Sequence, residues 1–134
     1  MALIYSLDTN TCIRAINGRA PQVRKQLLQV PAAEIVVCSI VRSELFYGAA
    51  KSQTPTRSRE KQDYFLNGFA SLPFDDTAAN AYATIRATLE KAGTPIGPLD
   101  MQIAAIAVAH NLILITHNTR EFSRIPNLNY QDWE

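Results

Sequence analysis

Four acidic residues in this sequence have the types and spacing to hold a divalent metal ion together. They are Asp8, Glu44, Asp100 and Glu121. Carboxylates that crowd one site repel each other and raise one another's pKa unless a cation lies among them. Oxygen ligands with no convergent histidine or thiolate select hard cations, so the set favours Mg²⁺, with Mn²⁺ as a substitute, over Zn²⁺.

Short apolar runs predict that these acids share one edge of a sheet. Residues 2–7, 34–39 and 112–116 form such runs, each too brief for a helix. Contiguous apolar strands indicate burial on both faces, which is typical of a parallel sheet covered by helices. Ligands of these sheets bind beyond the carboxyl ends of the strands. Asp8 ends the first run, and Glu121 lies in the loop after the last one.

Helical patterns separate the strands. We expect helices over 11–16, 41–51, 57–69, 78–92 and 99–111, a weak strand at 71–74 and an edge strand within 128–133. This alternation predicts an α/β fold with a central parallel sheet between helix layers. Glu44 is then expected near the first turn of its helix, and Asp100 at the start of its own. Asp76 and Thr77 are expected to cap the helix that Gly93 ends.

Each acid also has a purely structural explanation. An acidic residue in the first turn of a helix complements the helix dipole by about 0.3 to 1 kcal/mol, which would account for Glu44 and Asp100 without any function. Asp8 could be a turn or cap residue. Their joint convergence is harder to explain in this way, because clustered carboxylates destabilise a protein that has no cation to hold. We therefore expect a metal site.

Four ordered segments resemble one protein family. They are LDTN at 7–10, SIVRSELFYG at 39–48, TPIGPLDMQIAA at 94–105 and ITHNTREFSRIPNL at 115–128. Their order and spacing look like those of the PIN-domain toxins of the VapC type over nearly the whole chain. The resemblance implies a single PIN domain over residues 1–134, a three-layer α/β/α sandwich. It also implies a Mg²⁺-dependent endoribonuclease that serves as the toxin of a type II toxin-antitoxin pair.

The resemblance also implies roles for the acids. Asp8, Glu44 and Asp100 fall on the invariant acidic positions of the family's motifs. Asp8 and Asp100 are expected to bind the metal directly, while Glu44 completes the metal site or positions the attacking water. Many PIN domains carry Asp where this chain has Asn118. The subgroup with an NTREF-like segment has its acid at the position of Glu121, which is therefore the fourth expected catalytic residue.

Neighbouring residues are expected to support this site. Those expected to orient the carboxylates are Thr9, Asn10, Thr116 and Asn118, for which turn and strand-end capping is the alternative. No Ser, Cys or His is placed as an obvious nucleophile, so the expected reaction is in-line attack by water on a phosphodiester. His110 is expected at a helix end. His117 lies beside the proposed site and is a candidate substrate contact.

The RNA must be held although the formal net charge is only +1, from 13 Lys and Arg against 12 Asp and Glu. Local basic patches must therefore suffice. The candidates are Arg14, Arg19, Arg24, Lys25, Lys51, Arg57, Arg59 and Lys61, each of which could instead lie on a solvated helix face. Resemblance to the NTREF subgroup suggests tRNA as the substrate, with the initiator tRNA anticodon stem-loop as the first expectation.

The resemblance further implies protein partners. Family members form homodimers, and a small VapB-type antitoxin wraps the toxin and often places a basic side chain in the acidic site. Apolar material for such contacts is present in Leu45, Phe46, Tyr47, Tyr64, Phe65 and Phe69, although core packing would explain most of it.

Other classes of protein fit less well. No apolar stretch approaches the roughly 20 residues that span a bilayer, and the first residues lack a basic signal region, so a cytoplasmic location is expected. Cys12 and Cys38 lack the spacing of a zinc site and are expected to be buried and reduced. A phosphoaspartyl phosphatase would need a second Asp where Asn10 stands. A non-catalytic PIN-fold interaction module is the other alternative, should Glu121 not reach the metal.

Overall fold

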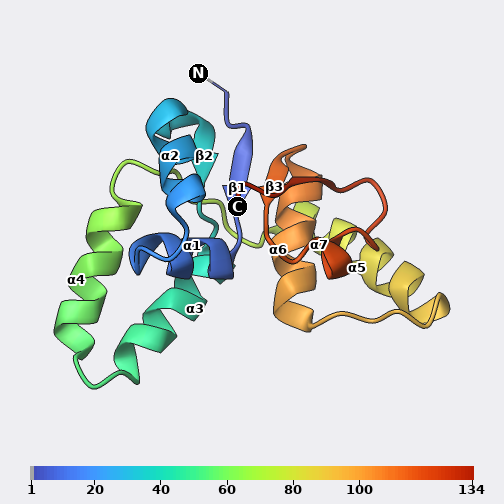
Figure 1. The fold of residues 1–134 in the computed structure, drawn as a ribbon. Coiled ribbons are helices and arrows are strands. Elements are labelled where there is room, and N and C mark those ends of the chain that lie inside the picture. Colours follow the sequence, from blue (N-terminus) through green and yellow to red (C-terminus); the bar gives the residue numbers. More distant parts are fainter. Residues whose placement is uncertain (1) are drawn as a thin grey trace.

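The computed structural model describes residues 2–134 and is built on a parallel sheet (Figure 1). Its strands are β1 (Tyr5–Leu7), β2 (Ile35–Val36), β3 (Ile113–Ile115) and β4 (Asn129–Gln131), in the spatial order β2-β1-β3-β4. All three pairings are parallel, which confirms the expected sheet and the edge strand near the C-terminus. Ser6 of β1 pairs with Val36 on one side and Leu114 on the other. The first strand is therefore central.

Helices cover the sheet on both sides. They are α1 (Thr9–Ile16), α2 (Pro21–Gln29), α3 (Ser39–Ala50), α4 (Pro55–Leu66), α5 (Asp76–Lys91), α6 (Pro98–Ala109) and the short α7 (Thr119–Phe122), with a 3₁₀ turn at Ala32–Glu34. Figure 1 shows α1 to α4 on one side of the strands and α5, α6 and α7 on the other. This arrangement confirms the α/β/α sandwich.

The core explains why the strands are apolar without alternation. Leu7, Ile35, Val36 and Leu114 are fully buried, because a sheet covered on both faces has no wet side. The same burial extends to α6, whose residues 103–107 are all inaccessible. Both cysteines are buried and free, as expected. Within residues 2–134, no helix is long and apolar enough to cross a membrane.

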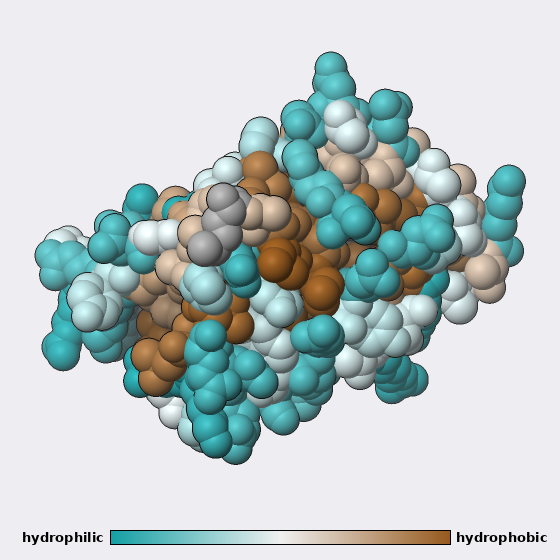
Figure 2. All heavy atoms as spheres, turned by 90° about the horizontal axis from the view of Figure 1, so that it is seen from above, coloured by the Kyte–Doolittle hydropathy of each residue, from teal (hydrophilic) through white to brown (hydrophobic). Residues whose placement is uncertain are grey.

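The face of the molecule at the amino ends of the strands is hydrophobic in its middle (Figure 2). Figure 2 views the molecule from above, the side on which the chain enters β1 in Figure 1. Hydrophobic side chains gather in the middle of this face, and hydrophilic ones form most of its rim. The acidic residues follow the opposite, carboxyl ends of the strands, as Asp8 does directly after β1.

Several expected boundaries are wrong. The run at 34–39 is a strand only over Ile35–Val36, because the next helix already begins at Ser39. As a result, Glu44 lies in the second turn of α3, not near its first. The cap of α5 is Asp75, whose carboxylate accepts the Ala78 backbone N–H at 3.0 Å, not Asp76 or Thr77.

Helix α2 was not expected, because PQVRKQLLQ buries a single residue and so carries little apolar periodicity. The chain reversals were better anticipated. Gly93 follows α5 with a φ of 71°, and Asn111 follows α6 with a φ of 54°. Both adopt the left-handed conformation with which helices commonly end. His110 is the C-terminal cap of α6, as expected.

The strand expected at 71–74 is also wrong. Only Ala70 forms a bridge, parallel to Val36 of β2. The backbone still follows the sheet edge, since the Val37 N–H donates to the Ala70 carbonyl at 2.9 Å and the Ser39 N–H to the Leu72 carbonyl at 3.0 Å. Pro73 then ends the pairing, because proline has no N–H to donate.

Arg42 of α3 fastens this edge to the rest of the fold. Its Nε donates to the Val37 carbonyl at 2.7 Å, and Nη2 donates to the Phe69 carbonyl at 3.2 Å. A charged donor that satisfies main-chain carbonyls at a partly buried position contributes more than a neutral one. The guanidinium therefore links the end of β2 to the chain that follows α4.

We predict that Arg42→Met lowers the free energy of unfolding by about 2 kcal/mol, because it leaves these carbonyls without their charged donor. Urea denaturation followed by circular dichroism measures the change. Arg86→Met is the matched control, since among residues 2–134 the exposed Arg86 bonds only with Glu90 and Tyr82 of its own helix, and it should leave the midpoint in place. Equal midpoints for the two variants would contradict a structural role for Arg42.

Candidate active site

Asp8 lies at the junction of β1 and α1 and is almost fully buried, with 5% of its surface exposed. It is the N-terminal cap of α1, where its Oδ1 accepts the Thr11 backbone N–H at 2.8 Å. Burial raises the pKa of this carboxyl, and hydrogen bonds with Thr11 and Thr116 act in the opposite direction. The helix N-terminus thus fixes one carboxylate oxygen of Asp8.

Asp100 is the acid on which the other three converge. It lies in the first turn of α6, after the Gly97-Pro98 start of that helix. Burial and then the charges of Glu44, Asp8 and Glu121 raise its pKa from 3.8 to about 6. The part of this shift that comes from charge requires the other carboxylates to lie close to Asp100. The four acids singled out in the sequence are therefore brought to one place.

Glu44 reaches the site from α3 and is held by α1. The hydroxyl of Thr9 donates to Glu44 Oε1 at 2.5 Å. Thr9 directly follows Asp8, so a single turn of chain positions two of the acids. Asn10, by contrast, is exposed, and its side chain forms no hydrogen bond within residues 2–134. The structure thus brings Thr9 to the carboxylates and leaves Asn10 outside them.

Glu121 approaches from the opposite side of β1, on α7. Its Oε2 accepts a hydrogen bond from Asn118 Nδ2 at 3.1 Å. The Asn118 backbone N–H in turn donates to Thr116 Oγ1 at 3.0 Å. Thr116 is fully buried at the end of β3 and also hydrogen bonds with Asp8. Thr116 and Asn118 therefore form a chain of contacts between two of the acids.

These donors fit a hard divalent cation. The four acids offer only carboxylate oxygens, which Mg²⁺ and Mn²⁺ prefer to nitrogen or sulfur. Burial first, and then the charges of Glu44, Asp8 and Glu121, raise the pKa of Asp100, and a bound cation would offset both effects. Asp8, Asp100 and Glu44 are the residues that could hold such an ion.

His117 does not turn toward these acids. Its Nδ1 pairs with Asp132 Oδ2 at 2.8 Å, and this carboxylate raises the pKa of the exposed imidazole. Glu134 lies beside this pair and forms an ion pair with Arg14 at 2.6 Å. The charge of Glu134 also contributes to the raised pKa of Asp8. Sequence reasoning missed Glu134, because only the folded chain brings the last residues beside the first helix.

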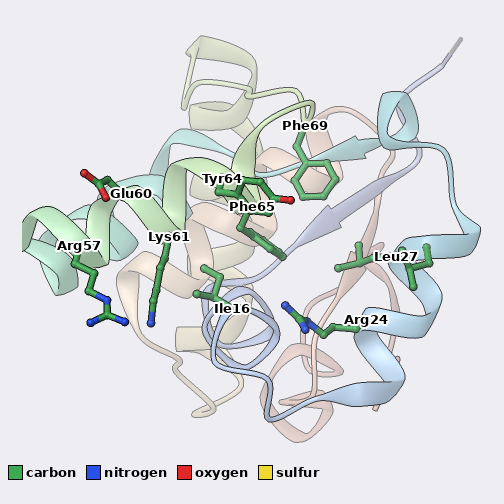
Figure 3. A pocket seen from close by; sticks show the side chains of 10 residues that line it. Ile16, Arg24, Leu27, Arg57, Glu60, Lys61, Tyr64, Phe65 and Phe69 are labelled. Atoms are coloured by element: carbon green, nitrogen blue, oxygen red, sulfur yellow. The ribbon is translucent and has the colours of Figure 1, made fainter.

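A separate apolar groove of about 760 Å³ lies between α2 and α4. Figure 3 shows Ile16, Leu27 and Phe65 pointing toward one another inside it. Leu28 and Tyr64 also line the groove and are 89% and 87% exposed. Such exposure of large apolar side chains around a hollow is typical of an interaction surface.

Some of the basic residues lie around this groove. Arg57 and Lys61 extend side by side from α4, and Arg24 enters from α2 (Figure 3). Others are engaged elsewhere, since Arg59 lies over the Phe46 ring at 3.5 Å and Lys51 over the Tyr47 ring at 4.8 Å. The apolar residues considered as contacts for a protein partner also fall into two groups, one in the groove and one elsewhere. Tyr64, Phe65 and Phe69 line the groove, whereas Leu45 is buried in the core.

Comparison with known proteins gives concordant matches. Residues 5–128 match the model of the PIN domain family. The chain is 38% identical over 131 residues to the tRNA(fMet)-specific endonuclease VapC of Salmonella typhimurium, covering 98% of each chain. It is 38% identical over 133 residues to Ribonuclease VapC2 of Rickettsia felis, covering 98% of this chain and 99% of that one. A solved structure of VapBC2 from Rickettsia felis, bound to a DNA fragment from its promoter, superposes with a TM-score of 0.93 at 36% identity, covering 98% of this chain and 100% of that chain.

The raised pKa of Asp100 makes a prediction about stability. A carboxyl whose folded pKa is about 6 and whose ordinary value is 3.8 binds its proton more tightly in the folded state. Its contribution to stability is fully present below about pH 4 and is lost as the pH rises through about 6.

We predict that Asp100→Asn raises the free energy of unfolding of the metal-free protein at neutral pH by about 1 kcal/mol, a value reduced by solvent screening at this half-exposed site. The difference from the unmodified protein should disappear by about pH 4. Urea denaturation in EDTA at both pH values measures it. A variant that is less stable at neutral pH would show that Asp100 has a structural role instead.

Proposed function

Because this chain belongs to the PIN-domain family and to its VapC ribonucleases, we propose that it is a divalent-metal-dependent endoribonuclease and the toxin of a VapBC-type toxin-antitoxin pair. The observation that carries this proposal is the convergence of Asp8, Glu44 and Glu121 on Asp100, whose pKa is raised to about 6 by burial and then by their charges. A bound cation stabilises such a cluster of carboxylates and can assist phosphodiester hydrolysis. The reaction is hydrolysis of an RNA phosphodiester bond.

Asp8, Asp100 and Glu44 are proposed to hold Mg²⁺, with Mn²⁺ able to substitute. When bound, the ion would neutralise charge on the phosphodiester and lower the pKa of a water molecule. Thr9 orients Glu44, and the N-terminus of α1 orients Asp8. These contacts fix the direction of the carboxylates before substrate arrives, which limits reorganisation during the reaction.

Glu121 is proposed to complete the acidic set from the far side. Its carboxylate is oriented by the Asn118 amide. Because Asn118 itself is neutral, the negative charge on this side comes from Glu121. In this role Glu121 holds or moves the proton of the attacking water, or binds a second ion.

We propose tRNA as the substrate, and the initiator tRNA anticodon stem-loop in particular. The Salmonella typhimurium relative is named as specific for tRNA(fMet), and this chain matches 98% of its length. The small net charge implies that recognition rests on local contacts around the site, not on a broad basic field. We place this activity in the cytoplasm, and a homodimer remains an expectation from the family.

The groove between α2 and α4 is proposed to take an apolar helix of a VapB-type antitoxin. Its walls supply the apolar surface that an amphipathic helix needs. Its rim carries three cations, Arg24, Arg57 and Lys61, against the single acid Glu60. The matching partner therefore has an apolar stripe flanked by acidic side chains. A solved relative is itself a VapBC complex.

The proposed activity is tested by incubating the purified, antitoxin-free protein with total tRNA in Mg²⁺ or Mn²⁺ and mapping new RNA ends. We predict discrete cuts that EDTA abolishes. Asp8→Asn should reduce the rate by at least about a hundredfold, because the charge stabilisation that a bound metal supplies is worth several kcal/mol. Asn remains a good helix cap, so this variant should stay folded.

Asp132→Asn is the control for this assay, because Asp132 pairs with His117 outside the acidic set. It should cleave as the unmodified protein does. Equal losses in the two variants, or cuts that persist in EDTA, would contradict the assigned site. A folded protein that cleaves no RNA with either metal would favour the non-catalytic interaction module.

We predict that Leu28→Ser combined with Tyr64→Ser weakens binding of the cognate VapB-type antitoxin by about ten- to a hundredfold, because it removes two exposed apolar contacts of the groove. Calorimetric titration measures the affinity. Tyr130→Ser, which changes an exposed aromatic on β4, is the control and should bind normally. Unchanged affinity of the double variant would place the antitoxin on another surface.

A further inference from the structure

Gly48 occupies a position in α3 where the fold itself gives no reason for a glycine. It is the tenth of the twelve residues of a regular helix, and its φ is not positive. A Cβ built on it would meet no other atom within 4 Å. Glycine within a helix is less stable than alanine, and it is useful where something must approach the backbone closely. The space beside Gly48 is therefore available to a molecule outside the chain.

This space belongs to a pocket of about 270 Å³ between α1, α3 and α4, which we call the α3 pocket. Its lining includes Glu44, so the pocket opens directly beside the proposed catalytic carboxylates. At its other end it shares Ile16 and Lys61 with the apolar groove. A molecule bound in the α3 pocket would therefore lie next to the phosphodiester bond that is cleaved.

The walls of the α3 pocket combine three kinds of contact. Ile13, which is 39% exposed, and Ile16 offer apolar surface. Asn17 and Gln62 offer amide groups, and Lys61 offers an ammonium. Gln62 donates Nε2 to the Leu45 carbonyl at 2.8 Å, while its buried Oε1 has no partner among residues 2–134.

This combination matches a nucleotide. A base stacks its face on apolar or aromatic surface and presents donors and acceptors at its edge, and its phosphate is attracted to a cation. A peptide helix would instead use a long apolar surface, which the groove between α2 and α4 provides and the α3 pocket does not.

We propose that the α3 pocket is the subsite for a nucleotide adjoining the scissile phosphodiester of the RNA. Gly48 leaves room for the nucleotide, Asn17 contacts the edge of its base, Gln62 forms the wall beside it, and Lys61 binds a phosphate. The proposal rests on the ribonuclease function proposed above and assigns part of its substrate specificity to this pocket.

The test is single-turnover cleavage of total tRNA by Gly48→Leu as a function of protein concentration, with Mg²⁺ present. The first side-chain carbon at this position has open space around it, so the leucine side chain starts in the pocket and occupies part of it. We expect the concentration at half-maximal rate to rise about ten- to a hundredfold, the effect of losing one stacked base, with a smaller change in the maximal rate. Ala50→Leu, which places the same side chain at an exposed position of the same helix, is the control and should leave both parameters unchanged.

Two further measurements keep the outcome decisive. Gly48→Ala should raise the unfolding midpoint, which shows that the fold does not require glycine here. Lys61→Gln removes the cation at constant size and should weaken RNA binding while lowering its salt dependence. Because Lys61→Gln alters another residue of the α3 pocket, it tests the subsite even where Gly48→Leu fails to fold.

Cleavage by Gly48→Leu equal to that of Ala50→Leu would overturn the subsite. Normal cleavage combined with lost antitoxin binding would overturn it in favour of a protein contact. An unmodified protein that cleaves no RNA would instead overturn the ribonuclease function and the subsite with it.

Discussion

Repulsion among carboxylates at one edge of the sheet is the constraint on which the rest of this structure depends. Burial and then the charges of Glu44, Asp8 and Glu121 raise the pKa of Asp100 to about 6, so the fold maintains an arrangement that burial and its own charges both oppose. The three acids around Asp100 are each restrained by a neutral neighbour: Asp8 by the N-terminus of α1, Glu44 by Thr9 and Glu121 by Asn118. None of these restraints neutralises a charge. The arrangement is therefore prepared for a cation, which would remove the repulsion while the carboxyl groups stay ionised.

The apolar parts of the chain supply the stability that opposes this repulsion. Asp100 is carried by α6, whose residues 103–107 are inaccessible to solvent, so the helix cannot shift to relieve the charge without exposing its core face. Asp8 is carried by the central strand, whose neighbours on both sides are parallel strands. The Asp8 backbone N–H even donates to the Ile115 carbonyl of β3 at 3.1 Å, which joins the first acid to the strand that leads to Glu121. Rigid packing thus sets the spacing of the acids.

The sequence predicted those features that arise from local pattern and missed those that arise from tertiary contact. Contiguous apolar runs predicted strands β1, β2 and β3, and a strand followed by an acid predicted where Asp8 would lie. The sequence did not predict helix α2, because its single buried residue, Val23, gives the segment no apolar periodicity. Pattern alone could not separate Thr9 from Asn10, since the difference lies in which side chain α3 meets after folding. Glu134 and the space beside Gly48 likewise exist only when distant helices and the C-terminus come together.

The two proposed surfaces are not independent, because they share Ile16 and Lys61. One ammonium cannot serve a phosphate in the α3 pocket and an acidic side chain on the rim of the groove at the same time. An antitoxin helix seated in the groove would therefore compete with RNA at Lys61 even where it makes no contact with the carboxylates. A basic side chain of the partner placed among Asp8, Glu44 and Asp100 would add to this competition by occupying the position of the cation. Competition at Lys61 requires the groove and the α3 pocket to adjoin, and the residues that they share show that they do.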